Sequence, residues 1–285
     1  MSSGEGPLAT AYAHCEAELR AEHHDAWLAT LLAPADARPH LHALGAFVHE
    51  VAQVQFRVRQ PVAGEIRLQW WQDVIDGGRA SEAVAHPVAA ALLDTVRHAM
   101  LPAAPFGDLL DGFRMALYDE PPVDIPAMEH RFLATHGMPI RLAARVLGGG
   151  AGIDTAADEA GIALGIAELL GDLRVEPGIH PVLLPTELMG RHGAARADLD
   201  ARRATPGVTA AVSELAALAR SRLAQLRVRR GTLGPAAPAF LTMALVEPVL
   251  AKAERASDPF TPLPEVPPWR RQWRLWRAAR RGGVL

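Results

Sequence analysis

The pattern of hydrophobic positions between residues 41 and 77 predicts two packed helices. In the first half, apolar residues recur at alternating steps of three and four: Leu44, Phe47, Val51, Val54 and Val58. This spacing places them on one face of an α-helix, and Pro61 ends that helix. A second helix, rich in apolar residues from Ile66 to Ile75, ends at Gly77-Gly78. We therefore expect the two helices to pack as a hairpin.

The rest of the chain also shows helical patterns, separated by short turns rich in Pro or Gly. The expected helices cover residues 7–32, 84–100, 106–118, 127–147, 155–176, 209–230 and 237–256. Pro139 should kink one of them, and Asp154 is a candidate N-cap for the helix after the glycine-rich break at 148–152. With no internal repeat and no clear boundary, residues 1–256 are expected to form one helical domain, followed by a Pro-rich link at 257–268.

Composition supports an all-α fold, because residues that favour strands are few and no sustained alternating pattern occurs. The formal net charge of -3 is too small to predict a highly charged partner. The single cysteine, Cys15, excludes an internal disulfide and suits a reducing compartment. The sequence shows no signal peptide and no apolar run of the ~20 residues that would span a bilayer. A cytoplasmic protein is expected, with peripheral contact to the inner membrane as an option.

Three carboxylates are spaced four residues apart near the middle of the chain. They belong to Glu168, Asp172 and Glu176, and this spacing places them on one helical face. Like charges at such a spacing repel each other, so a positive partner is expected nearby. Mg²⁺ is one candidate because it prefers oxygen ligands. A nearby arginine, Arg174, or a solvated surface are the alternatives.

Five short motifs follow one another along the chain: Ala46-Phe47, Arg67–Asp73 (RLQWWQD), Asp111–Leu117 (DGFRMAL), Leu169–Asp172 and Leu184-Pro185. In this order and at this spacing, they resemble the squalene/phytoene synthase family over about residues 10–256. The resemblance implies an isoprenoid-synthase fold, which is a helical bundle around a central cavity. Active members of that family join two prenyl diphosphates head to head, and they hold Mg²⁺ between two aspartate-rich motifs on opposite walls of the cavity.

The first of these two acidic walls is missing from this chain. Where the family carries it, residues 52–56 read Ala-Gln-Val-Gln-Phe. The second wall is kept in part, as Asp172 and Glu176. Ala116, Pro181 and Leu183 also stand where the family commonly has Asp, Arg and Tyr. These departures remove charges that would hold metal and diphosphate, so Mg²⁺ is expected only if the chain is active.

The departures themselves resemble a divergent branch of the family. Residues 50–54, 64–71 and 117–121 are most similar to the branch that includes a mitochondrial complex I assembly factor and its bacterial relatives. In that branch the fold is thought to work without the full metal site. The resemblance therefore implies a protein complex under assembly as one class of partner.

Basic and aromatic residues on the expected cavity helices are candidates for ligand binding. They are Arg67, Trp70, Trp71, Arg114 and Arg141. The arginines could hold an anion or a lipid head group, although ion pairs with neighbouring acids would explain them as well. One of the two tryptophans is expected in the core and the other at a helix interface. Next to the lost acidic wall, His49 and Glu50 are the remaining candidates for catalysis, with a buried polar pair as the alternative.

The last segment, residues 269–285, is predicted to be a basic, aromatic helix. Its candidate membrane-binding residues are Trp269, Trp273, Trp276, Arg270, Arg274 and Arg277. Tryptophan on one face and arginine around it suit an anionic membrane surface. The alternative is that the tryptophan face packs on the body. Nucleic acid is not an expected partner, because the rest of the chain offers no second basic patch.

Three functions remain open from the sequence. The first is a non-catalytic or altered family member that binds a lipid or prenyl ligand or assists the assembly of a membrane complex. The second is an active Mg²⁺-dependent head-to-head prenyltransferase that acts on prenyl diphosphates. The third is an adaptor at the membrane surface that works through its C-terminal helix.

Overall fold

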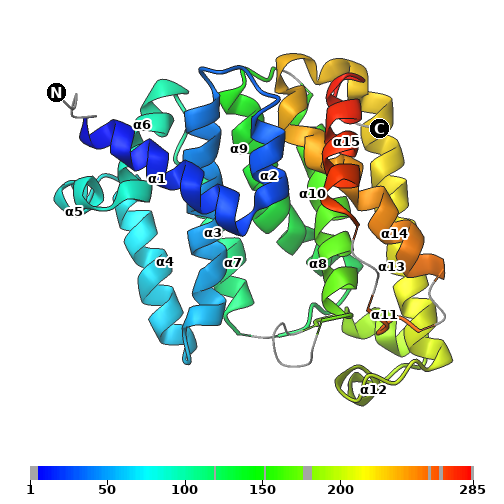
Figure 1. Cartoon of the computed structure of the whole chain (residues 1–285). Coiled ribbons are helices and arrows are strands. Elements are labelled where there is room, and N and C mark those ends of the chain that lie inside the picture. The colour runs from blue at the N-terminus through cyan, green and yellow to red at the C-terminus, as the bar shows by residue number, and fades with distance from the viewer. Residues whose placement is uncertain are drawn as a thin grey trace.

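The computed structural model describes residues 6–118, 120–150, 152–175, 182–255, 258–262 and 266–283, and these residues form helices and turns without a strand. Figure 1 shows the longer helices side by side in one bundle, with α1 lying across the front of α3. Two large clusters of buried apolar side chains fill it, one in the N-terminal half and one in the C-terminal half. The all-α prediction is confirmed.

The N-terminal half is organised around the predicted hairpin. Its helices are α1 (Pro7–Glu22), α2 (His24–Thr30), α3 (Arg38–Arg57), α4 (Pro61–Ile75), α5 (Ala80–Ala85), α6 (Pro87–His98) and α7 (Ala104–Ala116). α3 and α4 form the hairpin, and Pro61 starts α4 at a position where its missing N–H costs nothing. The rings of Phe47 and Phe106 are fully buried and lie edge to face, which joins α3 to α7.

The C-terminal half packs around one long, apolar helix, α10. The elements are α8 (Ile125–Phe132), η1 (Leu133–Gly137), α9 (Met138–Val146), α10 (Ile153–Asp172), α11 (Thr186–Arg191), α12 (Arg196–Asp200), α13 (Pro206–Val228), η2 (Arg229–Thr232), η3 (Gly234–Leu245), α14 (Val246–Arg255) and α15 (Pro268–Ala279). α10 lies against η1, α9, α13 and α14, and most of its side chains are buried. α3 and α10 both end at the lower end of the bundle in Figure 1.

Some predicted boundaries are wrong. The helix expected over 7–32 is two helices, because the chain turns at His23 between α1 and α2. α10 begins at Ile153 after Gly152, which adopts a positive φ, so Asp154 lies in the first turn and is not the N-cap. Glu176 lies outside the described residues, and α10 ends four residues earlier.

The kink expected at Pro139 takes the form of a π-helical turn. Residues Leu133–Gly137 wind one residue wider than an α-helix, and the Met138 N–H bonds to the Leu133 carbonyl. Pro139 has no N–H to continue the α-helical ladder, so a local widening before it accommodates the break. The wider turn places His136 toward α10, where its Nε2 lies 2.9 Å from Glu168.

One segment of the C-terminal half has the length and apolarity of a membrane span. Residues Gly234–Glu254 reach a mean hydropathy of 1.3 with 39% of the apolar window buried, whereas the sequence analysis expected no such stretch. The segment is not one continuous α-helix, since η3 is a 3₁₀-helix that contains Pro238. Phe240 and Leu241 are nearly inaccessible, and η3 packs on α2, α9 and α15. Core packing accounts for the apolar character of the buried part of this segment.

Part of the Pro-rich link is docked on the body. The buried Arg174 donates to the carbonyl oxygens of Pro259 and Thr261, at 2.6 and 3.3 Å. Arg202 donates to the Phe260 carbonyl oxygen at 2.8 Å, and the Phe260 ring belongs to the C-terminal core cluster. In this stretch, the extended link of the sequence prediction is held in place by two arginines.

Candidate functional site

The RLQWWQD segment lies on α4, and its two tryptophans have different environments. Trp71 is buried, and its ring packs edge to face on Phe47 with centroids 4.9 Å apart. Trp70 is half-buried, and its Nε1 donates to Glu82 of α5 at 2.8 Å. The expectation of one core tryptophan and one at a helix interface is met.

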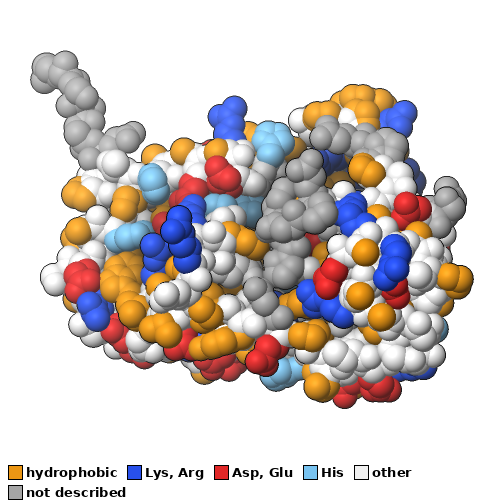
Figure 2. Space-filling view, turned by 90° about the horizontal axis from the view of Figure 1, so that it is seen from below, with side chains coloured by type: hydrophobic (Ala, Val, Ile, Leu, Met, Phe, Trp, Pro, Cys, Tyr) orange, Lys and Arg blue, Asp and Glu red, His pale blue; other side chains and the backbone are white. Residues whose placement is uncertain are grey.

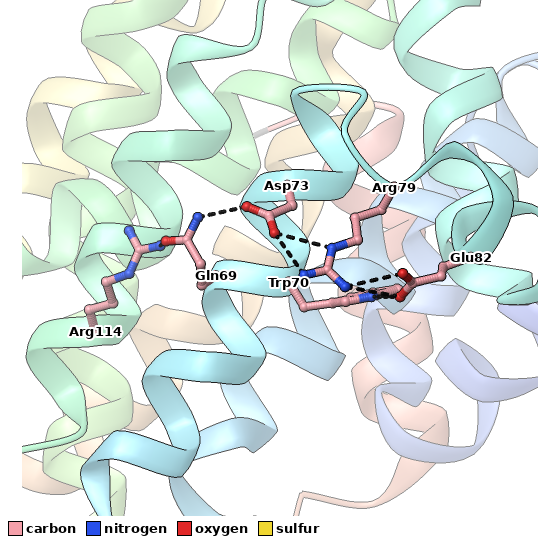
Figure 3. A network of polar contacts seen from close by, with 6 residues as sticks. All are labelled: Gln69, Trp70, Asp73, Arg79, Glu82 and Arg114. Carbon is pink, nitrogen blue, oxygen red and sulfur yellow. Dashed lines mark hydrogen bonds and ion pairs between the residues drawn. The ribbon is translucent and has the colours of Figure 1, made fainter.

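A polar network continues from Trp70 along the outer side of α4 (Figure 3). Arg79 lies between Asp73, at 3.2 Å, and Glu82, at 3.1 Å. Gln69 donates to Asp73 at 2.8 Å, and this bond, together with the nearby Arg79, lowers the pKa of Asp73. The network therefore ties the α4 motif to α5.

The same network reaches α7 through Arg114. Arg114 donates to Gln69 at 3.3 Å and forms an ion pair with Asp111, one turn earlier on its own helix. Arg141 of α9 is also engaged, with Asp154 at 3.2 Å and Asp158 at 2.5 Å on α10. Ion pairing with neighbouring acids thus accounts for both Arg114 and Arg141. Of the two interpretations offered from the sequence, ion pairs and binding of an anionic head group, the first describes these two residues.

Four of the sequence candidates line one cavity of about 350 Å³ between α3, α4 and the start of α6. Its wall consists of Glu50, Val54, Arg57, Arg67, Trp70, Trp71 and His86. The α3 residues are spaced by four and three, so they share one helical face. Two arginines at an apolar, aromatic wall suit the negatively charged head of an amphipathic molecule.

Glu50 is the unusual group in this cavity. Burial raises the pKa of its carboxyl to about 7, helped by the nearby Glu18 and opposed by Arg57. His86 Nε2 lies 3.6 Å from the Glu50 carboxylate, and burial lowers the pKa of that imidazole. Near neutral pH, Glu50 is therefore divided between its protonated and ionised forms, which is what a group that exchanges protons requires.

Two further candidates, His49 on α3 and Glu168 on α10, are each paired with a histidine. His49 Nδ1 lies 2.7 Å from Nε2 of His23, the residue at the break between α1 and α2. Glu168 lies 2.9 Å from His136 Nε2 on the π-helical turn. The charge of His23 also acts to lower the pKa of Glu168, so the two pairs are coupled electrostatically, and we call these three imidazoles and one carboxylate the cluster.

Glycines allow this cluster to form. A Cβ at Gly161 of α10 would lie 2.4 Å from Cα and N of Gly137, so the π-helical turn and α10 touch backbone to backbone. One turn further along α10, the ring of Phe132 packs against Gly165, where a Cβ would lie 2.4 Å from Cγ of that ring. This close approach brings His136 within hydrogen-bonding distance of Glu168.

The electrostatics of the cluster favour an ionised Glu168. Burial acts to raise its pKa, but the charge and hydrogen bond of His136, together with His23, outweigh burial, and the net pKa is lowered. Its side chain is nevertheless 58% exposed. Burial lowers the pKa values of His23 and His49. The cluster can hold and exchange protons or bind a polar group, and it is reachable from solvent.

The donor set does not fit the Mg²⁺ cluster that the family resemblance implies. The only acid on α3 is Glu50, which lies in the cavity with His86 and not beside Glu168. At the lost acidic wall α3 offers Ala52, Gln53 and Phe56, whereas Mg²⁺ prefers carboxylate oxygens. Within the described ranges, no group of three or more His, Cys, Asp or Glu is arranged to hold a metal ion. Glu176 cannot be placed, since it lies outside them.

Sequence reasoning missed two members of the cluster. These members are His23 and His136, and the sequence analysis singled out neither of them. Neither residue carries a local signal, because their partners are 26 and 32 residues away. Figure 2 looks onto the lower end of the bundle, where acidic, basic and histidine side chains surround the centre of the face.

Comparisons with known proteins agree with the family resemblance. The chain is 28% identical to complex I assembly factor 6 of Mus musculus over 266 residues, which cover 92% of this chain and 80% of the mouse protein. The Homo sapiens protein of the same name is 28% identical over 264 residues, covering 92% and 79%. The predicted likeness to this branch is therefore confirmed at the level of the sequence.

Solved structures support the fold. Squalene synthase HpnC from Alicyclobacillus acidocaldarius superposes with a TM-score of 0.76 at 20% identity, covering 92% of this chain and 98% of that one. A dehydrosqualene synthase solved with a ligand gives a TM-score of 0.79 at 18% identity, covering 96% of each chain. The model of the squalene/phytoene synthase family matches residues 19–277, which extends beyond the predicted resemblance and into α15. On this match over most of its length, the chain belongs to the squalene/phytoene synthase family.

Proposed function

We propose that this protein is a divergent family member that does not join prenyl diphosphates and that assists the assembly of a membrane protein complex. The observation that carries the first part is the α3 wall, where Ala52, Gln53 and Phe56 stand in place of carboxylates. Without acids on that wall, Mg²⁺ cannot be held between two acidic walls against a diphosphate leaving group. Glu168, on the other wall, is engaged with His136.

The second part rests on the relatives. The curated proteins that resemble this chain over 92% of its length are complex I assembly factors. Respiratory complex I is therefore the proposed complex. The cavity beside Trp70 and Trp71 gives this role a candidate ligand site, because its arginines and aromatic wall suit a lipid or prenyl molecule with an anionic head.

A deletion strain tests this function. Removing the gene from its own host should lower the amount of assembled NADH:quinone oxidoreductase, measured by native electrophoresis of membranes with in-gel NADH oxidation. Both the wild-type chain and Asp172→Ala should restore it, since no metal at the α10 wall is required. Unchanged complex I after deletion would refute the assembly role. Loss of a squalene or phytoene product that only wild type restores would favour the active prenyltransferase.

A further inference from the structure

The helix α15 packs on the body through a leucine and an alanine, and it exposes its three tryptophans. Leu275 and Ala278 are buried against η3 and α2, at 1% and 0% exposure. The side chains of Trp269, Trp273 and Trp276 are 63%, 51% and 47% exposed. Amphipathic helices normally turn their largest apolar side chains inward. The sequence alternative in which the tryptophan face packs on the body is therefore wrong, and that face is open to solvent.

Arginines surround the exposed tryptophans. The guanidinium groups of Arg270, Arg277 and Arg280 lie over the rings of Trp269, Trp273 and Trp276, at 5.0, 5.1 and 4.8 Å from the ring centroids. This stacking fixes the arginine heads at the level of the rings. Residues 268–283 contain six Arg and no acid.

Little negative charge offsets these arginines. Among the described residues, Arg271 alone of the six forms an ion pair, with Asp25 of α2. The other element beneath α15, η3, carries no charged residue. The Asp25 contact helps to fix α15 on the body. Because no acid among the described residues pairs with the other five arginines, they are available to an outside partner.

The basic surface extends beyond α15 onto η2. A Cβ at Gly282 would lie 3.8 Å from Cγ of Arg230, so the end of α15 adjoins η2. Arg229 and Arg230 are exposed, and the neighbouring Val228 is 88% exposed. In Figure 1, α15 lies on the outside of the bundle in front of η3 and next to α2. The arginine/tryptophan surface, defined as α15 with residues 228–230, is therefore broad.

We propose that the arginine/tryptophan surface binds the head-group region of an anionic lipid bilayer. Tryptophan favours the head-group region of a bilayer because its ring is apolar and its N–H is polar. Arginine is attracted to the anionic head groups themselves. The formal charge of the whole chain is -3, so the positive charge of this surface orients the molecule toward the bilayer. The proposal goes beyond the assembly role and does not depend on it.

Co-sedimentation with large vesicles tests the proposal on the full chain. Vesicles of phosphatidylcholine with one part in four phosphatidylglycerol should bind the protein at about 0.1 M salt, with a blue shift of the tryptophan fluorescence. Pure phosphatidylcholine vesicles should bind much less. Raising the salt to about 1 M should release the protein, because screening shortens the reach of the charges to about 3 Å.

Two triple variants and a matched control make the test specific. Trp269→Ala/Trp273→Ala/Trp276→Ala and Arg270→Gln/Arg280→Gln/Arg281→Gln should each lower the partition coefficient roughly tenfold or more. Arg59→Gln/Arg97→Gln/Arg196→Gln removes the same charge from other exposed positions and should bind like wild type. All of these side chains are exposed, and unfolding curves verify that each variant is folded.

Three results would overturn the proposal. The first is binding that the arginine triple variant and its control reduce equally. The second is equal binding to neutral and anionic vesicles. The third is no binding to anionic vesicles, and retention on duplex DNA or RNA in that case would assign the arginine/tryptophan surface to nucleic acid.

Discussion

At the scale of single residues, adjacent positions on α3 serve different sites. His49 contacts His23 in the cluster near α10, whereas Glu50 faces Arg57, Arg67 and His86 in the cavity beside α4. Consecutive helical residues point about 100° apart, so this divergence follows from the geometry of the helix. The sequence placed both residues next to the lost acidic wall, but it could not say that they point to separate partners.

Glu50→Gln should make the stability of the protein less dependent on pH. In wild type the pKa of Glu50 is raised to about 7, while the unfolded chain has the ordinary value of 4.5. The folded state therefore gains stability below the unfolded pKa, and this gain is lost as the pH rises through about 7. Between about pH 5 and pH 8, wild type should lose roughly 2 kcal/mol that Glu50→Gln retains.

Urea unfolding at several pH values measures this difference. Glu18, Arg57 and His86 also face the carboxyl, so only the change relative to wild type is interpreted. Glu120→Gln, an exposed position, serves as the control and should follow wild type. Parallel pH profiles for wild type and Glu50→Gln would show that Glu50 has an ordinary pKa.

At the scale of elements, the sequence predicted which segments are helical better than how they join. Periodic apolar positions identified α3, α4, α7, α10 and α13 to within a few residues. The turn at His23 contains neither Pro nor Gly, and so the sequence pattern predicted one continuous helix across it. The sequence correctly predicted that Pro139 interrupts the regular helix. It could not predict that the interruption is a π-helical turn, because that form depends on how η1 packs against α10.

The contact between η1 and α10 predicts opposite effects for two glycines on one helix. Gly161→Ala would place a methyl group 2.4 Å from the Gly137 backbone, which cannot move aside as a flexible side chain would. We expect a loss of about 3 kcal/mol in the free energy of unfolding. Gly171→Ala meets nothing within 4 Å and should gain up to about 1 kcal/mol, because alanine favours helix.

Urea denaturation of the two variants compares these values directly. Because both substitutions lie on α10, differences in the helix itself largely cancel. A Gly161→Ala protein as stable as wild type would mean that η1 and α10 are not packed backbone to backbone.

At the scale of the whole molecule, the fold was predictable and the site only in part. Short motifs in a fixed order identified the family, and the bundle follows from it. The same motifs turned out to include structural contacts, since Gln69, Asp73 and Arg114 stabilise the arrangement of helices. The loss of the acidic wall is visible in the sequence, whereas the His23, His49, His136 and Glu168 cluster is made by tertiary packing alone.

The arginine/tryptophan surface and the cavity lie on separate parts of this molecule. In the arginine/tryptophan surface, α15 packs on α2 and η3, whereas the cavity with Glu50 lies between α3, α4 and the start of α6. The two proposed binding sites, for a lipid surface and for an amphipathic ligand, therefore do not overlap.

Release of diphosphate from farnesyl and geranylgeranyl diphosphate in the presence of Mg²⁺ tests the central claim most directly. The fold is kept, but α3 lacks the carboxylates that would hold Mg²⁺ against the leaving group. Folded wild type should therefore release no more diphosphate than Asp172→Ala or buffer alone, while a dehydrosqualene synthase assayed in parallel does. Mg²⁺-dependent release that disappears in Asp172→Ala would contradict the account and restore the enzyme.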